Sequence, residues 1–176
     1  MTPKRIEAIL NYVDAIIKAG NIDQCPLDIN NLVKEFGGSV AQRDPVSPEK
    51  YDPCERIIPG DGRSFLIDYR ITTKEDINRF NLAHMLGHLF LHTNYIADGA
   101  LTKEFTEDIS LHPAHFEADI FAAALLMPKD KFLNIAEKNI IDSAYNTFAI
   151  GAYFGVPPRR VRSYGNLLSS FRWRDW

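Results

Sequence analysis

All five histidines of this 176-residue chain fall within 32 consecutive residues. His84 and His88 are four residues apart in a stretch whose pattern predicts a helix, and side chains with that spacing share one helix face. Both imidazoles can therefore reach one metal ion, and zinc binds histidine nitrogens at about 2.0–2.1 Å in a tetrahedral set. The spacing predicts a zinc site, with two ordinary histidines of an amphipathic helix as the alternative.

A third ligand has to come from another segment, and Glu117 is the candidate. It lies in a mostly apolar stretch, so its carboxylate needs a partner. A metal ion is one such partner, and an ordinary salt bridge is the other. His92 shares the stripe of His84 but lies about 12 Å from it along the helix axis. We therefore interpret His92 as a packed or hydrogen-bonded structural histidine.

Two sequence motifs together resemble the ImmA/IrrE family of metallopeptidases, which are bacterial and phage zincins that act on helix-turn-helix repressors. The motifs are RFNLAHMLGHLFLH at residues 79–92 and EADIFAAALLMP at residues 117–128, and the resemblance runs from about Pro26 to Leu168. It implies a zincin-like α+β domain, zinc as the cofactor, and a helix-turn-helix repressor as substrate or ligand. It also implies the zinc ligands His84, His88 and Glu117.

Position 85 departs from the family pattern, which has glutamate after the first histidine where this chain has Met85. That glutamate takes a proton from the attacking water and later passes it to the leaving amine. A thioether cannot do so, although methionine preserves the helix. We therefore expect an inactive or impaired peptidase, with the catalytic position filled by Met85. Nearby groups that could substitute for the glutamate are Glu104, Glu107, His112 and His115.

Three classes of function stay open. The chain is an impaired metallo-endopeptidase, or it is a non-catalytic module that sequesters a repressor, and Met85 favours the module. The weaker alternative is DNA binding, because residues 147–162 predict a helix, a tight turn and a second helix, similar to the helix-turn-helix-like part of the family. Arg159, Arg160 and Arg162 would then lie near phosphates. A helical hairpin with a solvated basic rim is the interpretation we favour.

Net charge, cysteine count and apolar run lengths bear on the class of function and on where the protein is located. Twenty Lys and Arg against 23 Asp and Glu give a net charge of −3, which argues against a strongly basic nucleic-acid-binding protein. Two cysteines, Cys25 and Cys54, are too few for a disulfide scaffold and are expected to be reduced thiols. No apolar run approaches the roughly 18–20 residues that a membrane span needs. We expect a soluble protein of the cytoplasm with no membrane partner.

Hydrophobic periodicity and turn residues predict helices, then a small sheet, then helices, which is an α+β order. Residues 1–138 are predicted to form the zincin-like core, and residues 139–176 a helical extension packed on it. The last two predicted strands form a hairpin, and an edge of the sheet is expected to accept an extended peptide. Helices are expected over about 3–20, 28–36, 74–93, 113–127, 129–138, 142–154 and 158–168, and strands over 39–43, 55–58 and 64–69.

Overall fold

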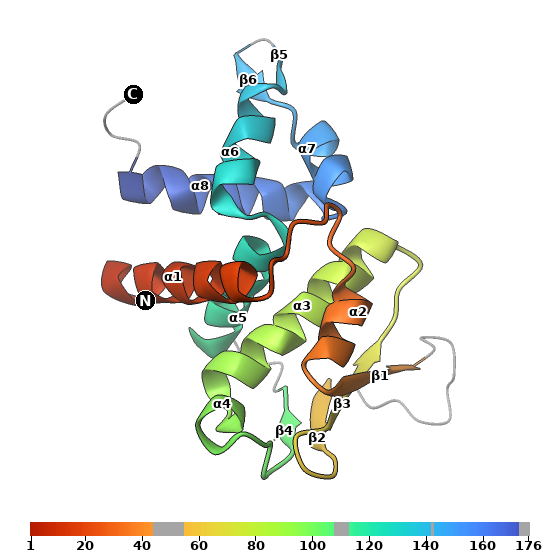
Figure 1. The fold of residues 1–176 in the computed structure, drawn as a ribbon. Helices are drawn as coiled ribbons and strands as arrows, with labels where there is room; N and C mark the ends of the chain where they lie inside the picture. The colour runs from red at the N-terminus through yellow and green to blue at the C-terminus, as the bar shows by residue number, and fades with distance from the viewer. Residues whose placement is uncertain (44–54, 108–112, 142, 173–176) are drawn as a thin grey trace. The chain divides into compact units, whose positions relative to one another are not determined.

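The computed structural model describes residues 1–43, 55–107, 113–141 and 143–172 (Figure 1). Within these residues, eight helices accompany a four-stranded sheet and a two-stranded hairpin. The predicted α+β class, a zincin-like domain with a small sheet, is confirmed. Contacts group the chain into two units, one of residues 28–119 and one of residues 1–27 with 120–176. The predicted division into a core of residues 1–138 and an extension of residues 139–176 stays a prediction.

The unit of residues 28–119 contains the four-stranded sheet, in the order β1-β3-β2-β4. Strand β1 is parallel to β3, whereas β2 is antiparallel to both of its neighbours. The predicted hairpin is confirmed, because Ile57 of β2 lies opposite Ile67 of β3. The elements of this unit are α2 (Ile29–Glu35), β1 (Gly38–Arg43), β2 (Arg56–Pro59), β3 (Phe65–Arg70), α3 (Glu75–His92), α4 (Tyr95–Asp98) and β4 (Phe105–Thr106).

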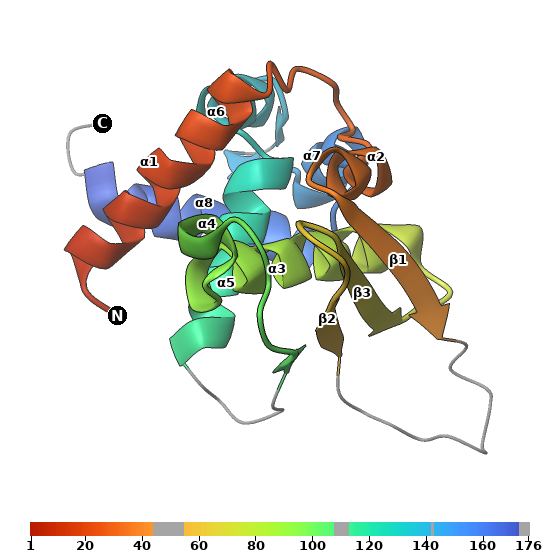
Figure 2. The same ribbon diagram turned by 60° about the horizontal axis from the view of Figure 1, so that its bottom comes forward.

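Helix α3 packs on the sheet, and Figure 2 shows it passing behind β1, β3 and β2. Every residue of α3 from 82 to 90 is buried, so this part of the helix is covered on all sides. It therefore lacks the exposed polar face of an amphipathic helix. Gly87 allows a close approach of α5, since a Cβ there would lie 2.9 Å from Cα of Ala118. A small residue at 87 therefore brings the residues around Ala118 next to His84 and His88.

The other unit consists of helices and one short hairpin. Helix α5 (Pro113–Leu126) belongs to the first unit up to Asp119 and to this one from Ile120. The remaining elements are α1 (Pro3–Ala19), α6 (Lys129–Glu137), β5 (Ile140–Ile141), β6 (Ala144–Tyr145), α7 (Thr147–Phe154) and α8 (Pro158–Arg172).

The N-terminal helix follows its prediction closely. The Thr2 hydroxyl accepts a hydrogen bond from the Arg5 amide at 3.3 Å and caps α1. The expected apolar stripe is buried at Ile6, Ile9 and Val13. No helix in the described ranges is both long and apolar enough to cross a membrane.

The helix predicted over residues 142–154 begins later than expected. Residues 140–141 and 144–145 instead pair as the strands β5 and β6, and Ser143 has a positive φ of 63°. The Asn146 side chain then accepts a hydrogen bond from the Ala149 amide at 3.1 Å. This cap starts α7 at Thr147, because asparagine is a strong N-cap residue and a weak helix former.

The predicted helix, tight turn and helix at the C-terminal end are confirmed as α7, Gly155 and α8. Gly155 has a φ of 65°, which favours glycine, and α7 contacts α8. Arg159 and Arg162 are exposed, and contact with DNA stays a prediction. The side chains of the aromatic tail, residues 171–176, lie outside the described part of the chain.

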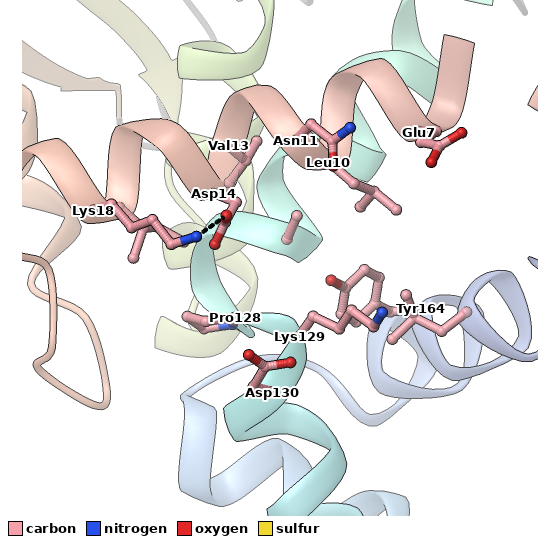
Figure 3. Close-up of a pocket in the computed structure, with 13 residues that line it drawn as sticks. Glu7, Leu10, Asn11, Val13, Asp14, Lys18, Pro128, Lys129, Asp130 and Tyr164 are labelled. Atoms are coloured by element: carbon pink, nitrogen blue, oxygen red, sulfur yellow. Dashed lines mark hydrogen bonds and ion pairs between the residues drawn. The ribbon is translucent and has the colours of Figure 1, made fainter. Parts of the chain in front are cut away.

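A cavity of about 390 Å³ lies among α1, α6, α8 and the end of α5. Figure 3 shows Tyr164 reaching from α8 into the space beneath α1. Tyr164 is only 2% exposed, and its hydroxyl has no hydrogen-bond partner in the described residues. Burial, and then the charge of Asp130, raise the pKa of Tyr164. The hydroxyl is therefore a buried polar group that no described protein group hydrogen-bonds in place of water.

Replacement of this tyrosine, Tyr164→Phe, should raise the free energy of unfolding by about 1 kcal/mol, since an unsatisfied buried polar group costs roughly 1–3 kcal/mol. Urea unfolding of the purified chain measures the change. The matched control is Tyr153→Phe, because Tyr153 is exposed. A loss of stability in Tyr164→Phe alone would show that the hydroxyl has a favourable partner.

Candidate metal centre

Four side chains from three segments bring metal-binding atoms together. His84 and His88 come from α3, His115 comes from α5, and Glu107 directly follows β4. One ligand atom of each lies within 4.8 Å of the others. The sequence predicts His84 and His88 as metal ligands, and both belong to this group. Glu117, the third ligand that the sequence predicts, is not a member of the group.

The distances within this group suit a tetrahedral metal site. Nε2 of His84 lies 3.1 Å from Nε2 of His88. The Glu107 carboxylate oxygen lies 3.1 Å from the first of these nitrogens and 3.9 Å from the second. It lies 2.7 Å from Nδ1 of His115. Ligands at 2.0–2.1 Å from a tetrahedral zinc ion are about 3.3–3.4 Å apart, so a zinc-sized ion fits with small side-chain shifts.

His84 and His88 are both held through their Nδ1 atoms, which leaves Nε2 of each directed into the group. Nδ1 of His84 lies 2.8 Å from a carboxylate oxygen of Asp119, to which it donates. Nδ1 of His88 lies 3.0 Å from Nδ1 of His92. A carboxylate on the remote nitrogen is the usual support of a metal-binding histidine.

Glu117 contacts His92, with 3.2 Å between the carboxylate oxygen and Nε2. His92 is therefore hydrogen-bonded, as expected from the sequence, and its structural role stays a prediction. The ligand role that the sequence predicts for Glu117 stays a prediction. The role of Asp119 was missed, and its place four residues after His115, on the same helix face, was the signal that could have shown it.

Strand β4 positions Glu107, which directly follows it, beside the α3 histidines. The amide of Glu107 donates to the carbonyl of Glu55 at 2.8 Å, which continues the β2–β4 ladder by one hydrogen bond. The Phe105 ring of β4 stacks on His88 with 4.7 Å between centroids. Backbone pairing and ring stacking therefore hold Glu107 beside the α3 histidines.

Electrostatics in the group couple its acids and imidazoles. Burial disfavours the charged form of His84, but its hydrogen bonds to the carboxylates of Asp119 and Glu107 outweigh burial and raise its pKa to about 9. Burial, and then the charge of His84, lower the pKa of His88 to about 2. Burial opposes ionisation of Glu107, yet the hydrogen bond from His84 lowers its pKa. Burial, and then the Glu107 charge, raise the pKa of Glu55 to about 7.

Position 85 offers no ionisable group, and the Met85 side chain is fully buried, with 0% exposed. Of the four groups named as substitutes for the missing glutamate, Glu107 and His115 belong to the metal-binding group. Glu104 is half-exposed and pairs with Arg56 at 4.0 Å. His112 lies outside the described residues.

The family described as the IrrE N-terminal-like domain (Peptidase M78) matches residues 62–162, which is more than half of the chain. The match covers all four members of the group, together with Met85. A comparison of the chain with curated protein sequences finds no match.

Proposed function

Because the chain belongs to the IrrE N-terminal-like domain family, we propose that it is a metallopeptidase-type protein that holds zinc on His84 and His88, with a third ligand from α5. The observation that carries the proposal is the group of four ligand atoms within 4.8 Å, which Glu107 completes. Three imidazole nitrogens and one carboxylate are ligands that zinc takes in proteins. The third ligand from α5 is His115, a member of this group, or Glu117, the ligand that the sequence predicts.

A bound zinc ion supplies Lewis acidity toward a carbonyl oxygen and toward water. The residues of the chain decide whether a proton can then move. Met85 accepts no proton near pH 7, and Glu107 is already engaged by His84 and His115. In our proposal the site therefore binds a polypeptide segment and hydrolyses it slowly or not at all.

The polypeptide that we propose as partner is a helix-turn-helix repressor in the cytoplasm, which the family resemblance suggests. The sheet offers support for binding an extended segment, because β4 is the last strand of the sheet order. Strand addition at such an edge provides backbone hydrogen bonds without demanding a particular sequence. Phe105 of β4 stacks on His88, so a segment added along β4 would pass beside the metal-binding group.

Zinc content at excess zinc tests the metal site. After removal of unbound metal, the purified chain and Glu75→Gln should each retain one equivalent, because Glu75 is exposed on the first turn of α3. His84→Ala should retain much less. Loss in His115→Ala together with retention by Glu117→Ala would show that His115 is the ligand from α5, and the reverse pattern would show that Glu117 is. A wild-type chain without zinc would contradict the proposed function.

Calorimetry with a panel of helix-turn-helix repressors tests the partner. We expect a repressor to bind the zinc-loaded chain and to stay intact through the titration. Binding of no repressor, with zinc retained, would contradict the partner while leaving the metal site in place.

A further inference from the structure

We propose that the cavity of about 390 Å³ among α1, α6, α8 and the end of α5 binds a small neutral organic molecule that carries a hydrogen-bond-accepting oxygen. The Tyr164 hydroxyl is the group that donates to this oxygen. The residues that line the cavity all belong to the unit of residues 1–27 and 120–176, and none belongs to the metal-binding group. The inference therefore goes beyond the proposed function and does not depend on it.

The cavity has the size and the composition of a small-molecule site. Such sites occupy roughly 300–1,000 Å³ and combine apolar walls with a few polar groups that fix the orientation of the ligand. The apolar walls of this cavity are formed by Leu10, Val13, Ile17, Ala124, Pro128 and Leu168. Val13, Ala124 and Leu168 are each at most 4% exposed, so much of this apolar surface is buried in the protein.

The Tyr164 hydroxyl is a buried hydrogen-bond donor of the cavity. Tyr164 is 2% exposed, and Figure 3 shows its ring directed from α8 toward the space beneath α1. The hydroxyl has no hydrogen-bond partner in the described residues. Burial, and then the charge of Asp130, hold the pKa of Tyr164 well above its usual value, so the hydroxyl stays protonated and donates. An oxygen atom of a ligand would give this donor the partner that it lacks.

Water and a pure hydrocarbon both fit this combination of groups poorly. A buried water makes about three hydrogen bonds. Among the described lining residues that are buried, only Tyr164 has a polar side chain. A hydrocarbon would cover the apolar walls but leave the hydroxyl without a partner. A molecule with an apolar body and one accepting oxygen matches both the walls and the hydroxyl.

The charges around the cavity favour a neutral ligand. Three carboxylates and two ammonium groups line it, those of Glu7, Asp14, Asp130, Lys18 and Lys129. Lys18 is already paired with Asp14 at 2.6 Å. The charge of Asp130 acts on the Tyr164 hydroxyl, so it would repel a carboxylate bound there. A cation would lose its hydration against the apolar walls, which is costly.

Three probes of similar size test the class of ligand by NMR titration of the purified chain. Acetophenone is a neutral ketone, ethylbenzene lacks the oxygen, and benzoate is an anion. We expect acetophenone to bind saturably and more tightly than benzoate. The methyl resonances of Leu10, Val13 and Ala124 should shift, because these residues line the cavity.

Tyr164→Phe tests the hydrogen bond. This variant should bind acetophenone roughly 10-fold more weakly than the wild type, because the ketone oxygen then enters the cavity without a donor. Ethylbenzene should bind the variant at least as tightly as it binds the wild type. Tyr153→Phe is the matched control, since Tyr153 is exposed and does not line the cavity, and its affinity for acetophenone should be unchanged.

Four results would overturn the proposal. Acetophenone fails to bind, or it shifts resonances outside the cavity, or it binds Tyr164→Phe as tightly as the wild type, or benzoate binds more tightly than acetophenone. Urea unfolding without a probe covers the case in which Tyr164→Phe folds poorly. A variant less stable than the wild type would show that the hydroxyl already has a partner within the protein, and the proposal would then be wrong.

Discussion

Zinc at about 1,000 times its dissociation constant should raise the free energy of unfolding by about 4 kcal/mol over the metal-free chain. The reason is that the four members of the metal-binding group lie on α3, on α5 and after β4, segments far apart in the sequence. The unfolded chain does not hold these groups together, so zinc binds the folded state preferentially. Urea unfolding in chelator and in buffered zinc measures the difference.

Two variants distinguish stabilisation by zinc bound at the metal-binding group from stabilisation by zinc bound elsewhere on the chain. His88→Ala should lose most of the zinc-dependent increment, because it removes a ligand atom from the centre of the group. Glu75→Gln should retain the whole increment, since Glu75 is exposed and outside the group. An equal increment in His88→Ala and wild type would mean that zinc stabilises the chain from another place.

Much of this fold could be predicted because the caps, turn residues and apolar patterns of its elements lie close together in the sequence. Helix α1 has a threonine cap, a proline in the first turn and an apolar stripe. Helix α3 and the β2–β3 hairpin have long apolar patterns bounded by turn residues. Strand β4 was missed because it contains only Phe105 and Thr106, too few residues to show alternation. Its pairing with β2 brings together residues that are 48 and 50 positions apart in the sequence, and no local pattern indicates such a pairing.

The two ligand candidates on α5 show what a sequence leaves undecided. His115 and Glu117 are two residues apart, so they point about 200° away from each other around a helix. His115 and Asp119 are four apart and share a face, and the structure turns that face toward His84. Apolar residues throughout this helix hide which side meets α3. Tertiary packing at Gly87 and Ala118 brings α5 against α3, and Glu117 also reaches α3 through His92, so both candidates lie beside the α3 histidines.

The second large effect concerns Met85, the position where the family has its glutamate. Met85→Glu should raise peptide-bond hydrolysis by at least ~10²-fold, the low end for a positioned general acid–base group. The new carboxylate can take a proton from water and return it to the leaving amine, which the thioether cannot. Mass spectrometry of a proteome-derived peptide library, incubated with each zinc-loaded variant, measures the cleavage rate.

Met85→Gln is the matched control for that experiment, because an amide has the shape of the carboxylate without its basicity. Position 85 is fully buried, so the glutamate variant should also be the less stable of the two when zinc is removed. Equal cleavage by the two variants would show that polarity at position 85 matters but proton transfer does not. Equal cleavage by wild type and Met85→Glu would assign the proton transfer to another group, with Glu107 and His115, which both contact His84, as the candidates.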